Sequence, residues 1–206
     1  MDFEGAKYVY SPTPRDLDSQ AAIWEGLRDG TFDLFSSDHC PFYFEGVNNT
    51  GKDNDRARTS FKWVPNGIPG VETRLPILFS EGSMRGRIDL PRFVALSSTN
   101  HAKTYGLYPR KGTIAIGADA DLAIWDPAAT RTIRHADLHD ASDYSPYEGL
   151  EVTGWPTTII RGGAVVVDDG VLGEGARSGR YIPRNRSNLA GPTETDVEQS
   201  STGRIR

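Results

Sequence analysis

The sequence predicts an α/β protein in two parts followed by a tail, and three observations support this. Between residues 6 and 36, two short apolar runs flank a helical pattern, which is typical of a parallel strand–helix–strand crossover. From Gly112 onward, helical periodicity gives way to short β-rich runs separated by turn residues. Residues 184–206 are polar and carry no capping pattern, which predicts a disordered tail.

The first crossover can be read residue by residue. Residues 6–11 are expected to form a strand that ends at Pro12, because proline interrupts strand pairing. Asp18 is the expected N-cap of the following helix, and Gly30 is its expected C-terminal stop. The apolar stripe of this helix consists of Ile23, Trp24 and Leu27. Residues 32–36 are the second expected strand.

A long aperiodic segment and further helices follow. Residues 42–70 show no periodicity, and a loop of this length inside a domain is usually functional. Residues 71–81 are helical in pattern, although Pro76 interrupts them. Asp89 is expected to cap a helix with Pro91 in its first turn, and Thr99 to open another that ends at Gly106. The residues expected to be buried by the helix at Asp89 are Phe93, Val94 and Leu96.

The second part is expected to be all-β. The expected strands are residues 113–116, 121–126, 130–134, 157–161 and 164–167. Gly162-Gly163 between the last two predicts a hairpin with a primed turn, since both positions then need a positive φ. Residues 168–170 are the next turn, and residues 135–156 are expected to be irregular.

Composition excludes several classes of protein. The 206 residues carry a net charge of −5, which argues against a nucleic-acid partner held by electrostatics. The single cysteine, Cys40, excludes an internal disulfide framework and a cysteine-rich zinc site. No apolar run is long enough to span a bilayer and no secretory leader pattern opens the sequence, so we expect a cytoplasmic protein without a membrane partner.

Few residues point to chemistry on their own. Asp38 would follow a parallel strand, where it could ligate a metal or act as a general base, or could simply cap the next turn. Cys40 is expected to be a packed thiol, and its neighbour His39 a structural hydrogen-bonding group. The turn at residues 65–70 could present main-chain groups to a small polar ring or be purely structural. His135 and His139 have a zinc-like spacing but lie among poor helix signals.

Longer strings resemble the dihydropyrimidinase/D-hydantoinase branch of the amidohydrolase superfamily from about residue 6 to residue 183. These strings are Ser-Ser-Asp-His-Cys-Pro-Phe (36–42), Pro-Asn-Gly-Ile-Pro-Gly-Val-Glu (65–72), Leu-Tyr-Pro-Arg-Lys-Gly-Thr (107–113), Gly-Ala-Asp-Ala-Asp (117–121) and Tyr-Ser-Pro-Tyr-Glu-Gly (144–149). The resemblance implies that residues 1–108 are part of a TIM barrel, with its strands 7 and 8 and their helices. Residues 109–183 would be part of a β-sandwich.

The resemblance also implies an activity. Members of this branch hydrolyse cyclic ureides and imides, such as hydantoins and dihydropyrimidines, to N-carbamoyl amino acids. They do so at a site with two metal ions, commonly zinc, and a carbamylated lysine is one of the groups that hold the metals. Asp38 matches the aspartate that is both a metal ligand and the catalytic proton acceptor. Ser11 and Asn66 match the residues that bind the substrate ring. A homo-oligomer, either a tetramer or a dimer, is implied for the complete protein.

The sequence also departs from this family. It contains no His-x-His pair, and neither its four histidines nor any lysine matches the other metal ligands. One carboxylate cannot hold a zinc pair, and two strands cannot close a barrel. We therefore expect a C-terminal portion of such an enzyme, an incomplete barrel that is inactive alone. The alternative is a non-catalytic scaffold protein related to dihydropyrimidinase, and a more remote one is an unrelated β-rich binding module.

Overall fold

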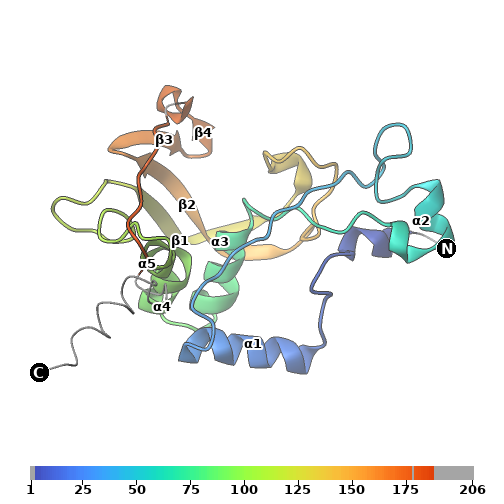
Figure 1. Ribbon diagram of the computed structural model, residues 1–206, viewed down its shortest axis with the longest axis horizontal. Helices are drawn as coiled ribbons and strands as arrows, with labels where there is room; N and C mark the ends of the chain where they lie inside the picture. Colours follow the sequence, from blue (N-terminus) through green and yellow to red (C-terminus); the bar gives the residue numbers. More distant parts are fainter. Residues whose placement is uncertain (1–2, 178, 188–206) are drawn as a thin grey trace, which may run out of the picture.

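The computed structural model describes residues 3–177 and 179–187, and has helices mainly in the first half and strands in the second (Figure 1). The α-helices are α1 (Leu17–Asp29), α2 (Asp55–Thr59), α3 (Arg74–Ile77), α4 (Leu90–Val94) and α5 (Asn100–Thr104). Wider π-helical turns at Leu78–Met84 and Ala95–Thr99 continue α3 and α4. Short 3₁₀ turns occur at Glu4–Tyr8, Phe61–Trp63, His135–Asp137 and Glu174–Arg177.

The strands form a four-stranded antiparallel sheet in the order β1-β2-β3-β4. They are β1 (Leu122–Thr132), β2 (Glu151–Arg161), β3 (Ala164–Asp168) and β4 (Val171–Leu172). The predicted hairpin is confirmed, because Gly162 and Gly163 have φ values of 58° and 85° between β2 and β3. The two runs expected at 121–126 and 130–134 belong to one strand, β1, whose pairing with β2 shifts register between Asp126 and Thr130. β2 also begins earlier than expected, within the segment predicted to be irregular.

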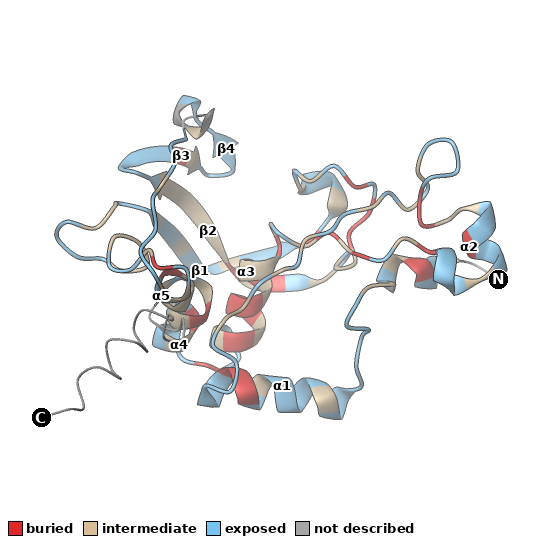
Figure 2. Ribbon diagram, in the orientation of Figure 1, coloured by how far each residue is buried: buried red, intermediate tan, exposed pale blue. Residues whose placement is uncertain are grey.

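In the part of the chain that the structure describes, buried apolar residues form two separate clusters (Figure 2). In the larger, Phe79 stacks on Trp125 of β1 with ring centroids 4.7 Å apart, and Phe93 of α4 packs edge-on against both rings. The smaller cluster joins Ala6 to α2 and the residues beside it, at the opposite end of the molecule (Figure 1). It consists of Ala6, Ala57 and Val64 with Phe3, Val9 and Phe44 packed against them.

The helices follow most of their capping signals. Asp16, not Asp18, caps α1, because its Oδ1 accepts a hydrogen bond from the Ser19 amide at 2.8 Å. Gly30 ends α1 in the left-handed conformation, with φ 97°, as predicted. Asp89 caps α4 as predicted, and its Oδ1 accepts the Arg92 amide at 2.7 Å.

The second half of the α4 region differs from the prediction. The helix runs through Thr99 without a new start, since the π-helical turn joins α4 directly to α5. Val94 is 48% exposed, whereas the neighbouring Phe93 and Leu96 are buried as expected. The π turn rotates the side chains of its residues relative to a regular helix, so simple 3.6-residue periodicity misplaces individual positions.

Three expected strands do not form among the described residues. Residues 6–11 contain a 3₁₀ turn and an extended stretch, and residues 32–36 and 113–116 are irregular. Residues 32–36 are held instead by isolated bonds, such as Phe35 N to Leu96 O at 3.1 Å. A strand is defined by its pairing, and no neighbouring strand lies beside these segments in the described part of the chain. Of the predicted strand–helix–strand crossover, only the helix, α1, is present in the described residues.

The molecule exposes an unusually large surface. Its accessible surface is 14016 Å², whereas a compact monomer of this mass exposes about 9,500 Å². The total includes the residues outside the described ranges. If the surface of a fully extended segment of their length is subtracted, the described part still exposes about 10,500 Å². A compact protein of the size of the described part would expose about 8,800 Å². Side chains that would be internal in a compact domain are thus open to solvent.

Most of the tail predicted at residues 184–206 lies outside the described residues. Within the described part, the Asn185 amide donates a hydrogen bond to Gly106 O at 2.8 Å. None of the helices that the structure describes has the length and apolar character of a membrane span.

Candidate functional site

Three segments far apart in the sequence meet around the turn at residues 65–70. The Gly67 amide donates to Val9 O at 3.1 Å, and the Cys40 amide donates to Ile68 O at 3.1 Å. A Cβ on Gly67 would lie 2.5 Å from Cys40 O, so only glycine permits this close approach. The turn is therefore held between the residues around Ser11 and those that follow Asp38.

The two predicted substrate-binding residues, Ser11 and Asn66, are in direct contact. Asn66 Nδ2 donates to Ser11 Oγ at 3.0 Å, across 55 residues of sequence. Both residues are exposed, so their remaining polar groups are accessible to a ligand. The main-chain N–H of Asn66 has no hydrogen-bond partner within the described residues, and it is a further free donor at this position.

Asp38 lies at an exposed corner beside the same turn. Its φ is 46°, in the left-handed region where aspartate is tolerated better than most residues. No hydrogen bond or ion pair engages its carboxylate among the residues that the structure describes. The reading of Asp38 as a turn cap therefore has no support within this region, and its carboxylate is free for other chemistry.

His39 fixes the backbone next to Asp38. Its Nδ1 accepts hydrogen bonds from the Gly70 amide at 3.0 Å and the Val71 amide at 3.2 Å. The imidazole thus closes the end of the 65–70 turn, as the structural reading of His39 expected. Cys40 is exposed, which corrects the expectation of a packed thiol, although its Cβ and Sγ lie beside Gly67.

Lys52 lies beneath the turn and was not identified from the sequence. Its side chain is fully buried, with 0% exposure, and its Nζ donates to Val9 O and Pro65 O, both at 2.8 Å. Burial lowers the pKa of Lys52 from 10.5 to about 8, because the charged form loses its hydration. No sequence signal distinguishes Lys52 from other polar residues of the aperiodic segment, since its burial arises only from the tertiary arrangement.

The described residues do not fit a metal centre. Nowhere in residues 3–177 and 179–187 do three or more His, Cys, Asp or Glu side chains gather closely enough to hold an ion. His135 and His139 do not share a helical face, because the 3₁₀ turn ends at Asp137. His135 Nε2 bonds Ser142 O at 2.6 Å, and His139 Nδ1 bonds Glu72 Oε1 at 3.0 Å.

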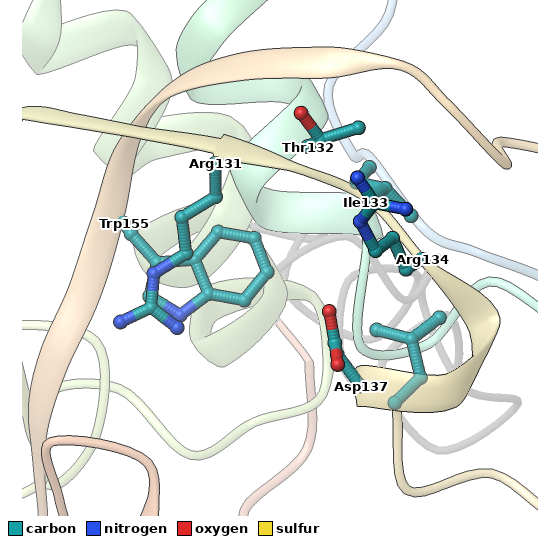
Figure 3. A pocket seen from close by; sticks show the side chains of 7 residues that line it. Arg131, Thr132, Ile133, Arg134, Asp137 and Trp155 are labelled. Atoms are coloured by element: carbon teal, nitrogen blue, oxygen red, sulfur yellow. The ribbon is translucent and has the colours of Figure 1, made fainter.

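A cavity of about 340 Å³ opens elsewhere, against the sheet (Figure 3). Arg131 lies across the ring of Trp155 there, with its guanidinium 4.9 Å from the ring centroid, and Asp137 points into the hollow (Figure 3). The lining residues are Arg131, Thr132, Ile133, Arg134, Asp137, Leu138 and Trp155. Because none of the predicted site residues lines this cavity, it is separate from the candidate site.

Comparisons with known proteins agree on one family. Residues 17–166 match the amidohydrolase family. The chain is 44% identical to a D-hydantoinase of Rhizobium radiobacter over 185 residues, and 45% identical to one of Geobacillus stearothermophilus over 183 residues. A solved structure of dihydropyrimidinase from Brevibacillus agri NCHU1002 superposes with a TM-score of 0.83 at 43% identity.

These matches cover nearly all of this chain but only part of each relative. The Rhizobium alignment spans 90% of the chain and 39% of the relative, the Geobacillus alignment 89% and 38%, and the Brevibacillus superposition 93% and 40%. The chain thus spans about two-fifths of the length of the relatives that it matches. The family match extends over well over half of the sequence, and the chain belongs to the amidohydrolase family.

Proposed function

We propose that this chain provides the substrate-binding side of a hydantoinase/dihydropyrimidinase, an enzyme that opens cyclic ureides and imides to N-carbamoyl amino acids. The 3.0 Å contact between Asn66 and Ser11 carries the proposal. These are the two residues expected to bind the ring, and the fold brings them together although 55 positions separate them. The names of the relatives, D-hydantoinase and dihydropyrimidinase, point to the same substrate class.

The groups at the site suit a small polar ring. A cyclic ureide alternates carbonyl acceptors and N–H donors around a rigid plane. The Asn66 main-chain N–H is a donor without a partner in the described region, and the Ser11 hydroxyl can still donate its proton. Together they would hold the ring in one orientation, which favours attack at a single carbonyl.

Asp38 would perform the proton transfers. Its carboxylate is exposed and forms no hydrogen bond or ion pair within the described residues, and it lies two residues from Cys40, whose amide is bonded to the 65–70 turn. A carboxylate held close to the bound ring can accept a proton from the attacking water and return it to the departing amide nitrogen. Asp38 is also the one residue of this chain that we propose as a metal ligand.

The amidohydrolase family is metal-dependent, yet the described residues alone do not make a metal site. A zinc site needs at least three protein ligands, and Asp38 would supply one. We therefore propose that the remaining ligands of a two-zinc site, including a carbamylated lysine, would come from polypeptide outside these 206 residues. The isolated chain is expected to bind fewer than two metal ions and to open no ring.

The large exposed surface also supports the proposal that further polypeptide completes the enzyme. An excess of more than about 1,500 Å² over a compact protein is comparable to the surface that specific interfaces bury. We propose that residues 1–108 complete a barrel, and residues 109–183 a sandwich, when the remainder of the architecture covers them. A homo-oligomer of the completed protein is part of this proposal. A non-catalytic scaffold is less favoured, because a scaffold has no chemical need for the free Asp38 carboxylate.

The experiment joins this chain to the preceding portion of the Rhizobium D-hydantoinase and measures ring opening of hydantoin and dihydrouracil together with metal content. We expect hydrolysis by the joined protein, with about two metal ions per chain, and none by the 206-residue chain alone. The Asp38→Asn variant should lose activity, whereas the exposed control Asp33→Asn should keep it. A joined protein that binds metal normally but opens neither ring would contradict the proposal.

A further inference from the structure

Lys52 is an unusual residue to find in the interior. Lysine is almost never fully buried without a charged partner, yet Lys52 has no exposed surface. Within the described part of the chain, no carboxylate forms an ion pair with it. The ammonium is satisfied by two main-chain carbonyls, each at 2.8 Å. A buried ammonium held in this way costs more free energy than an apolar side chain of similar volume would.

The two carbonyls that Lys52 Nζ contacts belong to the segments that carry Ser11 and Asn66. Pro65 O belongs to the peptide group whose N–H is that of Asn66, and Val9 lies two residues before Ser11. Lys52 itself is anchored, because its amide donates to Tyr43 O at 2.8 Å. One side chain therefore connects the backbones that carry both proposed ring-binding residues.

We propose that Lys52 is a positioning residue, which fixes the Pro65–Asn66 peptide group against the segment before Ser11 and thereby aims the Asn66 N–H at the substrate ring. The identity of the substrate ring in this inference rests on the proposed function. The hydrogen bonds of Lys52 do not depend on it. A hydrogen bond to a peptide carbonyl polarises that peptide group, so its N–H becomes a stronger donor. Lys52 thus acts on the ring through Asn66 without touching it.

A purely structural role explains the residue less well. Methionine has nearly the same length and volume as lysine and would fill the space without the cost of burying a charge. Features that cost stability are expected at functional sites rather than elsewhere in a fold. The position of Lys52, directly beneath the contact between Ser11 and Asn66, agrees with that expectation.

The first test uses the full 206-residue chain and the variants Lys52→Met and Lys62→Met. Lys62 lies ten positions away and is exposed, which makes it a matched control. Amide hydrogen exchange should speed up at least tenfold at Gly67 and Cys40 in Lys52→Met, while the Phe93 amide of α4 keeps its protection. Lys62→Met should exchange like the unchanged chain.

The second test measures hydantoin hydrolysis in the joined protein. Lys52→Met should lower kcat/KM for hydantoin about 10- to 100-fold, mainly through KM, because the ring loses an aligned donor while Asp38 is untouched. Unchanged exchange at the turn, equally faster exchange throughout the chain, or a KM equal to that of the unchanged protein would overturn the inference. If the joined protein opens no ring at all, the proposed function fails, and the exchange experiment still decides whether Lys52 holds the turn.

Discussion

The buried ammonium of Lys52 should make the stability of this chain depend on pH in a specific direction. Its pKa is lowered from 10.5 to about 8 in the folded state. Between pH 8 and 10.5 the unfolded chain keeps the Lys52 proton and the folded chain has lost it, so the free energy of unfolding rises with pH. One pKa unit corresponds to about 1.4 kcal/mol, which sets an upper limit of about 3.5 kcal/mol for the whole window.

Urea unfolding of the unchanged chain and of Lys52→Met, at pH 7 to 11, measures this contribution. The variant lacks the titrating group, so the difference in unfolding free energy should be constant below pH 8. It should then shift in favour of the unchanged chain by about 1–3 kcal/mol before levelling off near pH 10.5. Lys62→Met controls for the loss of one positive charge. A difference that stays flat, or that falls with rising pH, would refute the assignment of a buried, charged Lys52.

Further predictions concern the turn, the larger cluster and the catalytic carboxylate. Gly67→Ala should lower Tm by several degrees, because its Cβ would lie 2.5 Å from a backbone oxygen, whereas Gly5→Ala, with no atom within 4 Å, should leave Tm unchanged. Phe79→Ala should cost about 3–5 kcal/mol in thermal or urea unfolding, while Phe61→Ala, at a side chain 81% exposed, should cost less than about 0.5 kcal/mol. Asp38→Asn should leave Tm unchanged and reduce kcat of the joined protein at least about 100-fold; a large loss of stability would show that its carboxylate has a structural role.

Local signals in the sequence predicted local structure well. Gly30, Asp89 and the Gly162-Gly163 pair act through their own backbone conformations or through amides three residues away, so their structure does not depend on distant partners. The strand expected at residues 6–11 failed for the opposite reason. Strand formation requires a neighbour from elsewhere, and none lies beside these residues in the described chain.

The contacts of the candidate site also depend on residues that are distant in the sequence, so local sequence signals did not predict them. Ser11 and Asn66 could be named only through the family resemblance, because nothing in their spacing indicates that they touch. Lys52 could not be named at all. Its burial depends on Val9, Pro65 and the backbone of Tyr43 meeting in space, and each of these comes from a different stretch of the chain.

The register shift in β1 also bears on how this protein behaves at high concentration. Among the residues that the structure describes, β1 is an edge strand of 11 residues, and a long straight edge is a template for pairing with other molecules. The shift after Asp126 places Pro127 inside the strand, where it has no N–H to offer. Pro127 and the register shift thereby divide this edge into two shorter stretches. We expect the interruption to limit pairing of the edge with other molecules of the isolated chain.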